Sequence, residues 1–318
     1  MDITLSSFLT AIIIIAAPLI LAALGETLTE KAGVVNLSLD GTLLLSAMTG
    51  FAIAYETNSL LLGFLGGAIT GGAVALLLAI IGVWLGQSQV AVGFALTFLC
   101  RDLAYFLGTP YARKQGPQLE ILQIPILADI PFIGPLFFSH TAVVYLSFIA
   151  IPCCTYFLYR TRRGLILRMA GENPEGCWAR GVNPIKIRML YTIAGGFIVG
   201  LGGAGFSLAV KPGWGHPQGC EGIGWIALAL VIFGSWHPIR VVIGAYFFGL
   251  LQLLGIYFQD FFSGIPPQIF QVAPFPLMIG TLILIHLSNN TKNKQLSRWM
   301  RILNGRPPKW LGKVYHRS

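Results

Sequence analysis

Long apolar runs constrain this chain more than any other feature. "FLTAIIIIAAPLILAAL" (residues 8–24) and "FLGGAITGGAVALLLAIIGVWLG" (64–86) have about the length, roughly 20 residues, that a helix needs to cross a bilayer. The mean hydropathy of +0.74 over the whole chain is higher than a soluble core requires. The sequence therefore predicts an integral membrane protein. No charged region precedes the first run, so we expect it to be a retained span rather than a cleaved signal.

Further apolar segments follow, separated by Gly, Pro, Asn or charge clusters. They are residues 41–55, 90–108, 141–160, 188–210, 223–236, 240–259 and 268–287. Segments 41–55 and 223–236 are short, as re-entrant or broken helices are. The predicted fold is all-α, a polytopic membrane protein with about 8–10 transmembrane helices, some of them short or broken.

Positive charge is concentrated in residues 160–188 and in the tail 288–318. Lys and Arg accumulate on the cytoplasmic side of membrane proteins, so both regions are predicted to be cytoplasmic and the loop 109–140 external. The expected organisation is a transmembrane domain over 1–287 and a basic cytoplasmic tail over 288–318. The net charge of +9 then makes anionic lipid the nearest partner, and no nucleic-acid partner is invoked. The cysteines and histidines show no metal-ligand spacing, so we expect no metal and no disulfide.

Residues 171–184, "GENPEGCWARGVNP", contain the signals of a short helix. Asn173 is a predicted N-cap, Pro174 a first helical residue and Gly181 a C-terminal residue. Asn183 and Pro184 repeat the start signal for the next span. A two-turn helix is marginal alone, so either the flanking spans or a docked partner should hold it. The alternative is a simple capped connector.

This stretch resembles the cytoplasmic coupling helix of ABC importer permeases in the branched-chain amino acid, ribose and nucleoside group. "GETLTEKAGVVNLSLDGTLLL" (25–45) is similar to the N-terminal signature of the nucleoside and simple-sugar branch, and "GWIALALVIFGSWHPIRVVIGAYFFG" (224–249) to its C-terminal half. The chain departs from the usual pattern at Gly176 and Cys177, where the family has paired alanines. It also has Asp40 where Glu is common and His237 where Asn is usual.

The resemblance implies the permease subunit of an ATP-driven importer in the bacterial cell (inner) membrane, a transport subunit and not an enzyme. Its implied partners are separate ABC ATPase subunits, a second and related permease chain, and an extracytoplasmic solute-binding protein or lipoprotein. The chain has no GxxxxGK[ST] loop, so ATP must be bound elsewhere, and no cofactor is expected in this chain. The implied solute is a nucleoside, with a simple sugar second. An ion-coupled secondary transporter and a membrane enzyme are the alternatives from other classes.

Three sets of site residues follow from the resemblance. The coupling segment covers about residues 168–188, and its contacts with the ATPase are expected at Glu172, Asn173, Pro174, Trp178, Arg180 and Gly181. The translocation pathway or gate is expected at Glu26, Asn36 and Asp40, because polar groups at membrane depth are costly without a function. Docking of the binding protein is expected at Trp214, His216 and Gln218.

Each of these sets has a simpler alternative. Residues 25–40 could be an interfacial loop in which Glu30 or Asp40 pairs with Lys31, and 211–225 could belong to an aromatic belt. "GLGGAG" (200–205) satisfies a dinucleotide fingerprint, but it lies in an apolar run without a preceding strand, so we interpret it with Gly196 as a helix-packing surface. Arg101 and Asp102 are adjacent in a predicted helix, and we expect them to face different sides and not to pair.

Overall fold

The computed structural model describes residues 5–261, apart from 126, 129 and 132, together with residue 276 and residues 307–315. The predicted span 268–287 and most of the basic tail lie outside these residues. Everything below concerns the described part of the chain.

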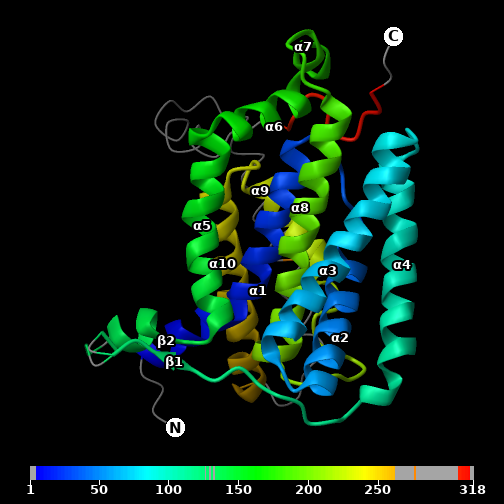
Figure 1. The fold of residues 1–318 in the computed structure, drawn as a ribbon. Coiled ribbons are helices and arrows are strands. Elements are labelled where there is room, and N and C mark those ends of the chain that lie inside the picture. Colours follow the sequence, from blue (N-terminus) through cyan, green and yellow to red (C-terminus); the bar gives the residue numbers. More distant parts are fainter. Residues whose placement is uncertain are drawn as a thin grey trace.

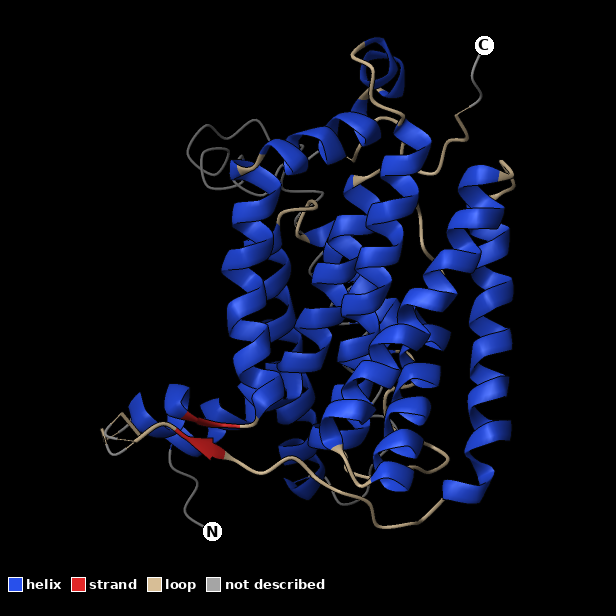
Figure 2. Ribbon diagram, viewed as in Figure 1, coloured by secondary structure: helices blue, strands red, loops and turns tan. Residues whose placement is uncertain are grey.

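The fold is helical, as predicted (Figure 2). The helices are α1 (Leu5–Lys31), α2 (Leu39–Thr57), α3 (Leu60–Leu78), α4 (Gln89–Gly108), α5 (Ala142–Arg160), α6 (Arg162–Glu172), α7 (Pro174–Ala179), α8 (Pro184–Gly205), α9 (Ile223–Phe233) and α10 (Pro238–Phe261). Short π-helical turns extend α3 to Trp84 and α8 to Val210. In the loop after α4, a 3-10 turn (Thr109–Tyr111) and a π turn (Gly134–Phe138) accompany a two-residue antiparallel ladder of β1 (Leu122–Gln123) and β2 (Ser139–His140).

Six of the described helices are long and apolar enough to cross a membrane: α1, α3, α4, α5, α8 and α10, with the π turns included. The helix α2 also has 19 residues, most of them buried, whereas α9 has only 11. The segment 41–55 therefore belongs to a continuous helix that is longer than predicted, whereas 223–236 contains the short helix that was expected. The beginning of α2 lies against α4 and against the beginning of α9, since Cβ atoms on Gly41 and Gly224 would lie 2.2 Å from Thr97 and 2.3 Å from Asp40.

Capping side chains explain where several helices begin. Ser59 caps α3 and Thr161 caps α6, each accepting a hydrogen bond from a backbone N–H of the first turn. Between α2 and α3, Asn58 adopts a left-handed backbone (φ 54°) that ends α2 and reverses the chain at once. Local sequence therefore sets these boundaries.

The helices α1 and α8 form the centre of the bundle (Figure 1). Helices α5 and α10 flank them on one side, and α2, α3 and α4 lie on the other. The helix α6 crosses one end of the bundle and α7 projects beyond it, whereas β1 and β2 lie at the opposite end. Most of α4 and α5 exposes apolar side chains, as surfaces facing lipid do, whereas α1 and α8 are mostly buried.

Glycines allow the central helices to touch. A Cβ placed on Gly195 of α8 would lie 2.5 Å from the carbonyl oxygen of Gly25 in α1. A Cβ on Gly200 would lie 2.2 Å from the carbonyl oxygen of Gly67 in α3, and one on Gly196 would lie 2.6 Å from that of Gly71. These approaches confirm that the glycine run in α8 is a packing surface.

The expectation for Arg101 and Asp102 was wrong. Arg101 Nε lies 3.3 Å from Asp102 Oδ1, and the pair is exposed on α4. The two Cβ atoms do point to different sides of the helix, but the long arginine side chain bends around to reach its neighbour. Its guanidinium also lies over the Phe98 ring, 5.3 Å from the centroid.

Candidate functional site

The first candidate region is the corner between α1 and α2, which we define as residues 32–38. The helix α1 continues through Glu26 and ends at Lys31, and Gly33 turns the chain with a φ of 93°. The helix α2 begins at Leu39. Residues 25–31 are therefore helical and only the corner is irregular, so the break falls within "GVVNLSLDG", where the glycines predicted one.

Within this corner, Asn36 organises a buried polar cluster. Its Nδ2 donates to Glu26 Oε2 at 3.2 Å, and its Oδ1 accepts from the Ser38 backbone N–H at 3.1 Å and from the Ser38 hydroxyl at 2.5 Å. Glu26 is 0% exposed and Asn36 2% exposed. Among the described residues, Glu26 Oε1 has no hydrogen-bond partner. Beside the corner, Glu26 thus has one buried carboxyl oxygen that is bonded to none of the described residues.

Asp40 joins the beginnings of α2 and α9. Its Oδ1 accepts from the backbone N–H of Gly224 at 3.1 Å. A Cβ on Gly224 would lie 2.3 Å from the Asp40 backbone, so the two helix starts are in direct contact. Both helix N-termini carry partial positive charge, which favours a carboxylate at this point. A second link joins α1 to the turn after α9, because Glu30 accepts a hydrogen bond from the Trp236 indole N–H.

The carboxyl groups of Glu30 and Asp40 therefore have partners other than Lys31. The interfacial-loop alternative required one of them to pair with Lys31, but neither does so among the described residues. The cluster is enclosed between α1, α2 and α9. It forms a closed joint in this structure, and its role as a pathway or gate stays a prediction.

The second candidate region is α7. Asn173 Oδ1 accepts from the Gly176 N–H at 2.9 Å, and Pro174 is the first helical residue. At the other end, Gly181 has a φ of 79° and its N–H donates to the Trp178 carbonyl at 2.8 Å. Asn183 then caps α8. The predicted capping geometry of this stretch is confirmed at each of these positions.

The helix α7 presents one face outward and one inward. Cys177 and Pro174 are buried, whereas Trp178 and Arg180 are exposed, together with Glu172, Asn173 and Gly181. Because α7 projects beyond the end of the bundle (Figure 1), the exposed face is accessible from that side. The geometry is that of a short capped protrusion anchored through buried Pro174 and Cys177.

The third candidate region is the loop between α8 and α9. Trp214 and Gln218 are buried here, 5% and 2% exposed, whereas His216 is exposed. Gln218 accepts from the Gly215 N–H and donates to the Gly213 carbonyl, both at 2.9 Å. Trp214 and Gln218 therefore hold the loop together from inside, whereas His216 lies on its surface.

Glu221 fixes this loop against α4. It accepts hydrogen bonds from the Tyr105 hydroxyl and, at 2.6 Å each, from the N–H groups of Gln218 and Gly219. Burial acts to raise the pKa of Glu221, but these hydrogen bonds outweigh it and hold the pKa below its ordinary value. His216 stacks on the Tyr105 ring with centroids 3.9 Å apart.

Comparison with known proteins places this architecture in a family. The sequence model of one protein family, the permease component of the branched-chain amino acid transport system, matches residues 8–283. The chain belongs to this family. It is an ABC importer permease.

Among relatives of this permease, the putative glucose ABC transporter permease TsgC13 of Haloferax volcanii is 36% identical over 87% of this chain and 84% of its own. The guanosine ABC transporter permease NupQ of Bacillus subtilis is 32% identical over 87% and 91% of the two chains. The nucleoside ABC transporter permease NupC of Lactococcus lactis is 29% identical over 88% and 92%. No solved structure matches the permease.

Membership settles the class of function. The permease is a multi-pass protein of the cell membrane and a transport subunit, not an enzyme. An ABC permease works with ATPase subunits and a solute-binding protein, so the secondary-transporter and membrane-enzyme alternatives fall away.

Sequence reasoning missed several structural residues of the permease. Arg188 was counted with the basic surface, yet it is 1% exposed. The sequence signal that could have predicted its burial was its position in the first turns of an apolar helix. The hydrogen bond between Tyr105 and Glu221 joins residues 116 apart, and the one between Glu30 and Trp236 joins residues 206 apart. Nothing in the local sequence predicts either pair.

Proposed function

We propose that this permease carries a nucleoside into the cell. The observation that supports it most is the segment 25–45, which resembles the nucleoside and simple-sugar branch and which forms the buried corner and the start of α2. NupQ and NupC, named for guanosine and nucleoside transport, align with nearly nine-tenths of the chain.

The pathway is proposed to pass the beginnings of α2 and α9, at Asn36 and Asp40. Two helices that begin inside the bundle offer N–H groups and carboxyl oxygens where a neutral solute with several hydroxyl groups can exchange hydrogen bonds. Glu26 Oε1 lacks a described partner and is such an acceptor. This cluster therefore suits a ribose or another sugar better than an apolar side chain.

A cluster of aromatic side chains at the C-terminal end of α2 supports a nucleoside as the solute, because it can contact a nucleobase. The Tyr55 ring lies 6.2 Å from Phe51 and 6.0 Å from Tyr111, centroid to centroid. Lys114 Nζ lies over Tyr55, 4.9 Å from its centroid. Partly exposed tyrosines of this kind can stack on a base.

A simple sugar is the second candidate, and TsgC13 favours it because it is 36% identical and is named for glucose. Both solutes share the hydroxyl groups that the corner would recognise. Only the base distinguishes them.

Coupling to the ATPase is proposed for α7, with the segment 168–188 on the cytoplasmic side. The exposed residues Glu172, Asn173, Trp178, Arg180 and Gly181 would enter a groove of the ATPase, and buried Pro174 would hold the helix start. The positive charge of 160–188 supports this orientation. Residues 307–315 lie at the same end of the bundle as α7 (Figure 1), which agrees with a cytoplasmic location of both the segment 160–188 and the C-terminal tail.

Three further partners are proposed: a binding protein, a second permease chain and anionic lipid. The binding protein is proposed to dock on the loop after α8, where His216 is exposed. The second permease is proposed to be a related chain, because Haloferax volcanii has both TsgC13 and TsgB13 among the relatives, at 36% and 26% identity. Anionic lipid is proposed to contact the basic residues around α6.

Uptake by the reconstituted complex tests the solute. Proteoliposomes that contain the permease pair, the ATPase and the binding protein are supplied with labelled guanosine, uridine, glucose or leucine. We expect ATP-dependent accumulation of the nucleosides, competed by other nucleosides and not by glucose. Accumulation of glucose alone would establish the second candidate, and accumulation of leucine alone would contradict both.

A further inference from the structure

Residues 307–315, which we call the strap, lie across the α7 end of the bundle (Figure 1). The Trp310 N–H donates to the Gly171 carbonyl at 3.0 Å, just before α7 begins. The Gly312 N–H donates to the Gly33 carbonyl at 3.1 Å, in the corner between α1 and α2. The strap therefore bridges the root of the coupling helix and the corner that holds Asn36.

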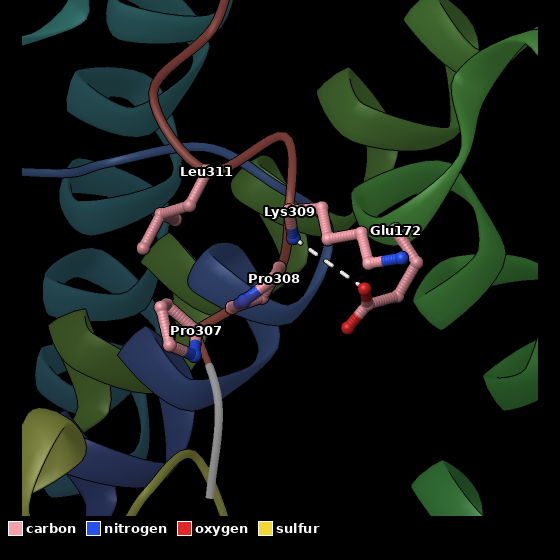
Figure 3. Close-up of a pocket in the computed structure, with 5 residues that line it drawn as sticks. All are labelled: Glu172, Pro307, Pro308, Lys309 and Leu311. Carbon is pink, nitrogen blue, oxygen red and sulfur yellow. Dashed lines mark hydrogen bonds between the residues drawn. The ribbon is translucent and has the colours of Figure 1, made fainter.

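A third hydrogen bond attaches the strap beside α7. The Lys309 N–H donates to Glu172 Oε2 at 3.4 Å (Figure 3). A hollow of about 600 Å³ lies between Glu172 and the strap residues Pro307, Pro308, Lys309 and Leu311. Backbone hydrogen bonds and the packing of buried Pro308 and of Leu311 against the core thus define the position of the strap.

Arg188 of α8 connects the strap to the end of α6. Its Nε and Nη2 donate to the Ala170 carbonyl at 3.3 and 3.1 Å, and its Nη1 donates to the Lys313 carbonyl at 2.9 Å. The side chain is 1% exposed, and no carboxylate forms an ion pair with it among the described residues. A buried guanidinium needs hydrogen-bond acceptors, so Arg188 favours the arrangement in which both carbonyls are held in place.

The corner itself completes this junction. A Cβ on Gly171 would lie 2.3 Å from the Lys31 carbonyl oxygen, so the end of α6 rests directly on the end of α1. A Cβ on Gly33 would lie 3.0 Å from Arg188 Nη2 and 3.1 Å from Gly171 Cα. Three segments distant in sequence therefore meet around one guanidinium.

We propose that the strap and Arg188 form a clasp that makes α7 and the α1–α2 corner move together. This inference rests on the proposed function, because it takes α7 as the element that the ATPase moves. Displacement of α7 would then pull on Gly33, three residues before Asn36, and reach the buried Glu26–Asn36 cluster. Arg188 is a positioning residue in this linkage and touches neither ATP nor solute.

Reconstituted complexes with three variants test the clasp. Arg188→Met removes all three bonds, Arg188→Lys can keep only part of them, and a chain ended after residue 306 removes the strap but leaves the Ala170 bonds. Lys313→Ala is the matched control, because it keeps the backbone carbonyl that the clasp uses and removes only the ammonium group, which lies 6.0 Å from the Trp310 ring centroid. Copurification of the ATPase, ATP hydrolysis and solute uptake are measured on each.

We expect the ATPase to copurify at the wild-type level in every variant and ATP hydrolysis to continue. Solute taken up per ATP hydrolysed should fall about tenfold in Arg188→Met and in the chain ended after 306, and less in Arg188→Lys. Lys313→Ala should match the wild type. A fourth variant, Arg188→Met in the chain ended after 306, should be no worse than Arg188→Met alone, because both changes open the same clasp.

Unchanged uptake per ATP in a strap-less complex that still binds the ATPase would overturn the clasp while leaving the proposed function intact. Should Arg188→Met fail to fold, the strap-less chain decides. A defect that appears only in vesicles containing anionic lipid would instead make the strap a lipid anchor. If Trp178→Asp and Arg180→Glu leave the ATPase bound and transport coupled, α7 is not the coupling element and the inference falls with that assignment.

Discussion

The helix α7 and the α1–α2 corner are both polar interruptions of an apolar chain, yet they are built in different ways. The capping bonds of α7 and its C-terminal turn join residues at most five apart. The corner and the carboxyl groups on either side of it are held by longer-range bonds, in which Asn36–Glu26, Asp40–Gly224 and Glu30–Trp236 are 10, 184 and 206 residues apart. A locally determined element can move as a unit, whereas the corner is satisfied only when α1, α2 and α9 are assembled. This difference suits α7 to receive a force and the corner to respond to one.

The largest expected effect is at the contact of α2 and α9. In Gly224→Ala the new Cβ would lie 2.3 Å from the Asp40 backbone, so the two helix starts must separate. We expect a loss of about 3 kcal/mol of stability, measured by thermal unfolding in detergent, and loss of uptake. The comparison is Gly66→Ala, whose Cβ would meet only the flexible end of Ile53. Equal melting temperatures for the two variants would contradict the tight contact.

Asp40→Leu should have the next largest effect. It removes the acceptor of the Gly224 N–H and leaves a buried donor without a partner, at a cost of about 2 kcal/mol. Uptake should be lost while the ATPase stays bound. Asp40→Asn keeps the oxygen acceptor and should retain part of the uptake. Asn36→Leu breaks the bond to Glu26 and should also reduce uptake; normal uptake by both leucine variants would remove the pathway assignment.

At α7, Trp178→Asp and Arg180→Glu should change binding more than folding. Arg180 is exposed and Trp178 is 37% exposed, so the melting temperature should stay near the wild-type value in Arg180→Glu and fall somewhat in Trp178→Asp. Copurification of the ATPase should weaken about tenfold, because a large aromatic and a cation are removed from the contact. Arg180→Lys, which keeps the charge, is the matched control. If both variants bind the ATPase fully, α7 is only a connector.

The smallest effect is expected for Asn173→Ala. It removes the cap on the Gly176 N–H, worth about 1 kcal/mol of local helix stability. Solute-stimulated ATP hydrolysis should fall modestly, whereas uptake-independent properties such as membrane insertion should not change. Asn173→Asp retains a capping oxygen and should restore the coupling. An effect as large as that of Asp40→Leu would mean that α7 is not determined locally.

Much of this protein could be predicted from the sequence because the evidence was local. Apolar runs identified the spanning helices, and Asn173, Pro174 and Gly181 marked the beginning and end of α7. The glycines around residues 196–200 indicated close helix packing. In each case the reason lies within a few turns of helix, where hydrogen bonding and steric fit depend on neighbouring residues.

The roles of individual polar residues could not be predicted in this way. Trp214 and Gln218 were expected on a docking surface, but they are buried inside their loop. Arg188 was counted as surface charge, yet it lies buried between the Ala170 and Lys313 carbonyls. Composition shows that a residue is polar, but only the folded chain shows which atoms surround it.

The sequence by itself determined the membrane environment, the helical class and the shape of α7, because hydropathy and capping act over short stretches. Only the tertiary structure decided that Asp40 joins α2 to α9, that Glu30 meets Trp236 and that the strap closes over Arg188. A buried carboxyl group or guanidinium must find partners wherever the chain brings them, and these partners come from segments up to 206 residues distant. Their identity therefore depends on how the helices pack.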